Sequence, residues 1–261
     1  MAFAVNVKTS LARSVRRQGK WAWLEHGTWA TLWTTFGFGV LVAWPPTWVT
    51  AATLVGLSAV AAAKVLVARV HRGQMGRWAL STYLVVGGAG MVPLLLSAFS
   101  FVLPVGVAGA GFLAVYFQAS RSPQRTRTLP VELTGIVLMS SAAGLAVLSA
   151  EPAAVGGAAL AWGLSAVLFA PGVPRAKLLK SRTAGLRVLL LGMAGVGVAA
   201  FVLLASAGWI AWWGALGALA FVGDVSAAVL MRRVGTRRLG MTLTLRNAAV
   251  ALLVGFAWKP F

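Results

Sequence analysis

The sequence predicts an all-α fold: a polytopic membrane helix bundle of about nine transmembrane helices, with the N-terminus inside and the C-terminus outside. Of its 261 residues, 59% are hydrophobic and only 10% are charged, whereas soluble proteins have about 45–50% apolar and ~25% charged residues. Too few charged side chains remain to cover a soluble fold of this size. The 30 glycines agree with this class, because glycine lets spanning helices approach closely.

Residues 1–24 form a basic arm without a single acidic residue. The arm lacks the apolar core and the small-residue cleavage site of a secretory signal. An Arg-rich, acid-poor N-terminus also occurs in organelle transit peptides, and that alternative stays open. We expect a cytoplasmic or interfacial segment with Trp21 and Trp23 at headgroup level. The basic residues of the arm are Lys8, Arg13, Arg16, Arg17 and Lys20.

A single transmembrane domain is predicted over residues 25–258, followed by an outer tail, 259–261. Its apolar segments are long enough to cross a hydrocarbon core of ~30 Å when tilt is allowed for. Pro45-Pro46 ends the first segment, because proline lacks the N–H that a helix needs, and Glu151-Pro152 marks a later turn. The predicted spans are 25–43, 48–68, 78–98, 100–119, 131–149, 155–172, 187–206, 209–230 and 241–258.

With nine spans, basic connections alternate along the chain with connections that contain no Arg or Lys. The connections after the second, fourth, sixth and eighth spans are rich in Arg and Lys, and the other connections contain neither. Placing the N-terminus inside puts all 23 basic residues except Lys259 on or near one side. This alternation follows the positive-inside rule, so the basic loops are expected to be cytoplasmic and the chain to lie in the inner cell membrane.

Ionisable residues inside the apolar segments are the first candidates for a site, because each costs ~2.5–3.5 kcal/mol at the centre of a bilayer. Asp224 lies eight residues before Arg232, and Arg246 lies eight residues after Arg238. Both are therefore ~12 Å from the basic end at helical rise. We predict an ion pair between Asp224 and Arg246, with Asn247 nearby. Whether this pair is structural or part of a site stays open at this point.

The richest polar stretch is WAWLEHGTWATLW, from Trp21 to Trp33. Glu25 and His26 lie at the start of the first span, and His26 shares a helical face with Trp29. His26 is a candidate haem ligand in principle, although the other His lies in a loop and no cofactor is predicted. The plainer interpretation is a hydrogen-bonding His among interfacial Trp anchors.

Glu132 begins the fifth span just after Pro130, where an acid also complements the helix dipole. The candidate residues all fall toward the basic side of the membrane. We therefore expect a polar pocket open to the cytoplasm that binds an anionic amphiphile: a lipid, quinone, polyprenyl or haem-like molecule. The ligand-binding candidates are Glu25, His26, Trp29, Glu132, Asp224, Arg246 and Asn247; no metal site is expected.

The segment Glu25 to Ala30, EHGTWA, resembles the (Q/E)HG(A)WA signature of the YwiC-like membrane proteins, with Thr28 where Ala is usual. The resemblance extends to Pro130 to Gly135, to Trp162 to Arg175 and to Arg237 to Asn247. It implies a bacterial multi-pass membrane protein.

A remoter likeness, in architecture, is to the UbiA-type intramembrane prenyltransferases. Those enzymes bind a diphosphate through Mg²⁺, which needs hard oxygen ligands from Asp-rich motifs. The corresponding connections here, Ala68 to Trp78 and Gly172 to Arg187, contain no Asp or Glu. We therefore lean against an enzyme, although the question stays open.

Three functions remain. The first is a non-catalytic or accessory protein that binds an amphiphile; the second is a Mg-independent, UbiA-like lipid or prenyl transferase; the third is an organic-anion transporter. The expected partners are membrane lipids with anionic headgroups at the cytoplasmic face, and a membrane complex in which the chain is an accessory subunit. Nucleic acid is not expected, despite the net charge of +19.

Overall fold

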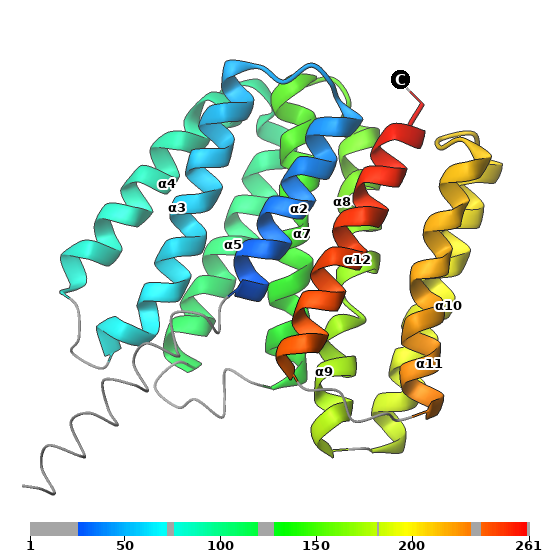
Figure 1. The fold of residues 1–261 in the computed structure, drawn as a ribbon. Helices are drawn as coiled ribbons and strands as arrows, with labels where there is room; N and C mark the ends of the chain where they lie inside the picture. The colour runs from blue at the N-terminus through cyan, green and yellow to red at the C-terminus, as the bar shows by residue number, and fades with distance from the viewer. Residues whose placement is uncertain (1–25, 72–75, 120–127, 182, 231–235, 260–261) are drawn as a thin grey trace, which may run out of the picture.

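A computed structural model describes residues 26–71, 76–119, 128–181, 183–230 and 236–259. These residues form an all-α bundle whose helices run up and down side by side (Figure 1). In the described ranges the only β-type contact is an isolated bridge between Ile210 and Trp258. The helices are α2 (His26–Val42), α3 (Trp48–His71), α4 (Arg77–Ser97), α5 (Phe99–Ala119), α7 (Leu129–Ala150), α8 (Val155–Phe169), α9 (Gly172–Ser181), α10 (Ala184–Ser206), η1 (Trp212–Phe221), α11 (Val222–Leu230) and α12 (Thr236–Ala257).

Each predicted span coincides with a helical segment in this part of the chain. Among the described residues, six helical segments are long and apolar enough to cross a membrane: α3, α4, α5, α7, α8 with α9, and α10. Shorter apolar stretches lie in α2, over Trp29–Val42, and in α12, over Met241–Ala257. The predicted segment 209–230 is divided between η1 and α11.

Helix α7 lies at the centre of the bundle, and 61% of its apolar span is buried. Every residue from 140 to 149 is buried, so this part of α7 is covered on all sides. This stretch is rich in Ser, Ala and Gly, and small residues let neighbouring membrane helices approach closely. By contrast, only 6% of the α5 span is buried, and its apolar side chains are left for surrounding lipid.

Glycines allow close helix contacts between α2 and α7 and between α3 and α4. A Cβ at Gly39 of α2 would overlap the backbone carbonyl of Ala143 in α7. A Cβ at Gly90 of α4 would lie 2.7 Å from Gly56 Cα in α3. Such close approach of two backbones is how small residues hold membrane helices together by van der Waals packing.

The prediction of a loop after residue 172 is wrong, because the helix α9 begins there and extends to Ser181. Pro171 interrupts the preceding helix since it has no N–H to donate. A new helix then begins at Gly172, with Pro174 in its first turn, where a missing N–H is tolerated. The following residues AKLLK are strong helix formers. Arg175 is therefore held on a helix inside the bundle.

The second interruption is η1, a 3₁₀-helix that changes to α-helix at Val222. A 3₁₀-helix has three residues per turn, so residues three apart share one face. Gly214, Gly217 and Ala220 have this spacing, and all three are buried. The ring of Phe201 from α10 fills the notch at Gly217. Small residues at a period of three therefore explain this unusual segment.

Candidate functional site

An ion cluster lies where the two interrupted helical segments meet α12. Asp224, in the first turn of α11, is completely buried and is contacted by two arginines. Arg246 Nη1 of α12 lies 2.7 Å from Asp224 Oδ2, and Arg175 Nη1 of α9 lies 2.9 Å from Asp224 Oδ1. The predicted ion pair between Asp224 and Arg246 is therefore present in the structure. Arg175, which was not predicted, forms a second ion pair with the same carboxylate.

Arg246 connects four elements through its guanidinium group. In addition to Asp224, Nη1 donates to the Ala220 carbonyl at 3.1 Å, and Nη2 lies 3.5 Å from the Leu168 carbonyl. Ala220 is near the end of η1 and Leu168 is near the end of α8. Carbonyls at helix ends lack their usual N–H donors. Arg246 thus supplies donors where both interruptions leave carbonyls.

Asn247 completes the support of Arg246. Its side chain is buried, and its Oδ1 accepts a hydrogen bond from Arg246 Nε at 2.9 Å. The structure thus brings together Asp224, Arg246 and Asn247 of the sequence-based candidates. Two guanidinium charges and one carboxylate charge leave the cluster with a net charge of +1.

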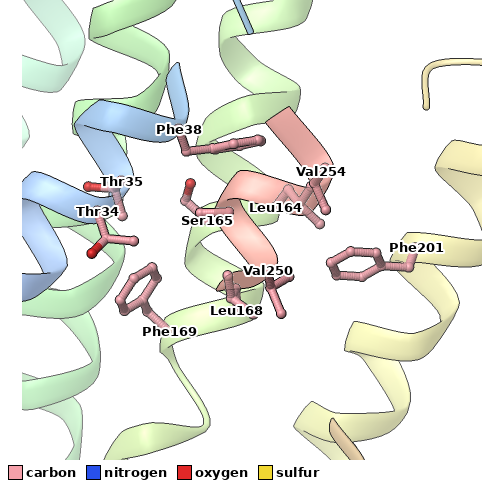
Figure 2. A pocket seen from close by; sticks show the side chains of 11 residues that line it. Thr34, Thr35, Phe38, Leu164, Ser165, Leu168, Phe169, Phe201, Val250 and Val254 are labelled. Atoms are coloured by element: carbon pink, nitrogen blue, oxygen red, sulfur yellow. The ribbon is translucent and has the colours of Figure 1, made fainter. Parts of the chain in front are cut away.

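An apolar pocket adjoins the ion cluster, and Leu168 belongs to both. The Leu168 carbonyl faces Arg246, and its side chain lines the pocket. Figure 2 shows Phe38 of α2, Val250 and Val254 of α12, and Phe201 of α10 around the same space. The free volume is about 10 Å³, roughly the room that one water molecule needs. Entry of an acyl or prenyl chain therefore requires these side chains to move apart.

Three hydroxyl residues, Thr34, Thr35 and Ser165, line one side of this pocket (Figure 2). Thr35 is fully buried, and its hydroxyl donates to the carbonyl of Thr31 in its own helix at 2.8 Å. A hydroxyl bonded to its own helix costs little in an apolar interior. The pocket is therefore mainly apolar, and the charges lie beside it.

Glu132 lies on a different face from the ion cluster. Its Oε2 is 2.9 Å from Lys177 Nζ of α9, and the two side chains are 35% and 24% exposed, respectively. Arg175 and Lys177 are two residues apart on α9, so they point to roughly opposite sides of that helix. Helix α9 therefore uses one side for Asp224 and another for Glu132, and the shared depth of the two acids does not bring them together.

The remaining candidates lie at or near the start of α2. Glu25 is outside the described residues, and His26 is described only as the first residue of α2. Trp29 is half-buried and packs against the cluster of Leu32, Phe36, Ala61, Ala142 and Ala146. Among the described residues, no three His, Cys, Asp or Glu side chains are grouped so as to hold a metal ion.

Arg175 is the site residue that sequence reasoning missed. Its segment was assigned to a connection between spans because it is rich in Arg and Lys. The available signal was Pro171-Gly172 followed by helix-forming residues, which predicts an interruption and a second short helix.

Comparison with known protein families finds a match over part of the chain. Residues 24–147 match the family described as YwiC-like protein. No curated protein and no solved structure matches the chain, so the likeness to UbiA-type prenyltransferases stays a prediction. The segments Trp162 to Arg175 and Arg237 to Asn247 lie beyond the matched residues. With its six long apolar helices, the chain is a multi-helix membrane protein, and over residues 24–147 it is similar to YwiC-like proteins, which confirms that resemblance for this part.

Proposed function

We propose that this chain is an inner-membrane protein that binds the anionic headgroup of an amphiphile from the cytoplasmic side, in a non-catalytic or accessory role. The observation that carries this function is the cationic cluster of Arg175, Asp224 and Arg246 next to an apolar pocket. A guanidinium group matches the geometry of phosphate and carboxylate oxygens. The adjoining apolar side chains suit the greasy part of the same molecule.

The proposed topology has nine spans, with the N-terminus inside and the C-terminus outside. Exposed tryptophans support interfaces at both ends of the bundle, since Trp is enriched where a membrane meets water. Trp44, Trp48 and Trp212 are 71%, 72% and 69% exposed at the end where α2 finishes and α3 and η1 begin. Trp78, 75% exposed, lies at the opposite, basic end. The positive-inside rule assigns the basic end to the cytoplasm.

A second candidate, transport of an organic anion, gains support from the interrupted segments. Transporter sites are commonly formed where discontinuous helices meet, with charged groups at the break. The α8–α9 and η1–α11 interruptions both meet Arg246. The Mg-independent transferase has no comparable observation in its favour among the described residues.

Mass spectrometry of lipids retained after gentle purification tests the proposal. We expect retained amphiphiles to be enriched in anionic headgroups relative to the membrane from which the protein was extracted. A retained pool with the bulk composition contradicts the proposed function. Uptake of an organic anion by proteoliposomes indicates the transporter instead, and turnover of a prenyl diphosphate indicates the transferase.

A further inference from the structure

The two arginines that contact Asp224 are held very differently. Arg246 is fixed by Asp224, Asn247 and the carbonyls of Ala220 and Leu168. Within the described ranges, Arg175 is hydrogen-bonded through Nη1 to Asp224 and through no other atom. A guanidinium group has five N–H donors. Arg175 therefore keeps Nε and Nη2 available, and its side chain is 17% exposed.

Asp224 is the internal counter-charge of this pair of arginines. It is fully buried, and each of its carboxylate oxygens accepts from a different arginine. Arg246 has other acceptors, so it does not depend on Asp224 alone for its position. The carboxylate thus competes with an incoming anion mainly at Arg175.

We infer that Arg175 is the residue that binds the anionic group of the ligand, and that Asp224 lowers the affinity of this site by occupying Arg175 in the unliganded protein. The ligand group is a phosphate with one negative charge, which matches the net charge of +1 and the phosphate chemistry of anionic membrane lipids. Arg246 is the positioning residue that fixes Asp224. This inference rests on the proposed function and names the residue and the chemistry that carry it.

The opposite signs of two substitutions separate this assignment from a purely structural role. Arg175→Gln removes the binding group while Arg246 still compensates Asp224. Asp224→Asn removes the competing charge and raises the net charge of the cluster from +1 to +2. We expect Arg175→Gln to weaken binding at least about tenfold, which corresponds to ~1.4 kcal/mol. We expect Asp224→Asn to strengthen binding severalfold.

The experiment uses the full chain in neutral detergent and measures dissociation constants for phosphatidylglycerol and for phosphatidylcholine with the same acyl chains. Arg175→Lys keeps the charge but loses the planar fork of donors, so we expect an intermediate loss. Arg77→Gln is the matched control, because Arg77 is an exposed basic residue at the same end of the bundle, on α4. Competition by inorganic phosphate shows whether the phosphate suffices or whether the lipid is required, and both outcomes fit the inference.

Three results decide against it in distinguishable ways. If the wild-type chain binds neither the anionic lipid nor phosphate, the proposed function fails together with the inference. If the wild-type chain binds and Arg175→Gln binds as Arg77→Gln does, only the inference fails. If the folded Asp224→Asn variant binds phosphatidylglycerol with the same affinity as the wild type, Asp224 does not compete with the ligand for Arg175, and that part of the inference fails. Should Asp224→Asn not fold, the series Arg175→Gln, Arg175→Lys and wild type decides alone.

Discussion

The helices before residue 150 and those after it are held together by different physical means. In α2 to α7, unbroken apolar helices approach through small residues, as Gly39 does against Ala143. Hydroxyl side chains add neutral contacts between them, such as Thr47 Oγ1 to the Ser149 carbonyl at 2.7 Å. From α8 onward, two segments are interrupted, and charged side chains of α9, α11 and α12 take part in every salt bridge among the described residues.

This difference shows where chemistry enters an otherwise apolar bundle. An unbroken helix satisfies its own backbone, so it needs no charged neighbour inside a membrane. An interrupted helix leaves carbonyls without donors, and a guanidinium group can supply several donors at once. The family match at residues 24–147 covers most of the first region and ends before the second. The residues of the ion cluster lie outside the matched segment.

The largest expected effect is in the second region, at Arg246. Arg246→Gln leaves Asp224 with one arginine and removes donors from the carbonyls of Leu168 and Ala220. Breaking a buried ion pair by removing one partner costs about 3–5 kcal/mol. We expect a clear fall in the thermal unfolding midpoint of the purified protein in detergent. The double variant Asp224→Asn with Arg246→Gln should recover part of it, because the fully buried side chain at position 224 then carries no charge, while Arg175, which loses its carboxylate partner, is 17% exposed.

Arg77→Gln is the control for that measurement, since an exposed surface substitution changes stability by no more than about 0.5 kcal/mol. If Arg246→Gln unfolds at the same temperature as Arg77→Gln, the cluster does not stabilise the second region. The two regions would then not differ in the way described.

The next effect is in the first region, at the contact between α2 and α7. Gly39→Ala places a methyl group against the Ala143 carbonyl, and the helices must separate. Overpacking of this kind costs about 1–3 kcal/mol. Gly37→Ala is the matched control, because nothing lies within 4 Å of a Cβ at Gly37. Equal unfolding temperatures for the two variants would show that close glycine packing does not hold α2 on α7.

Apolar segment lengths and the positions of charges predicted the helices well. The depth of Asp224 and Arg246 followed from counting helical rise from the basic end. That depth could not predict Arg175, because its segment had been assigned to a loop. The segment is basic, as connections between spans are, yet it forms the helix α9, with Pro174 in its first turn.

Depth also does not define the direction of a side chain around its helix axis. The sequence places Glu132 and Asp224 toward the same, basic end of their helices, yet they contact residues on different faces of α9. Such a separation depends on helix rotation, which near-uniformly apolar segments do not reveal. The sequence analysis also did not predict the 3₁₀-helix η1, although the small residues Gly214, Gly217 and Ala220 are spaced three apart.

The smallest expected effect concerns Glu132, the acid that belongs to the first region. Glu132→Gln breaks its pair with Lys177, whose side chain is 24% exposed, while that of Glu132 is 35% exposed. Pairs with this exposure contribute about 0–1 kcal/mol, because water and salt screen them. We expect a shift in the unfolding midpoint close to that of Glu151→Gln, an exposed acid at the opposite end of α7. We also expect unchanged binding of phosphatidylglycerol, since Lys177 and Arg175 lie on different sides of α9. A loss of binding in Glu132→Gln comparable to that in Arg175→Gln would join the two faces of α9 into one site and remove the division between the two regions.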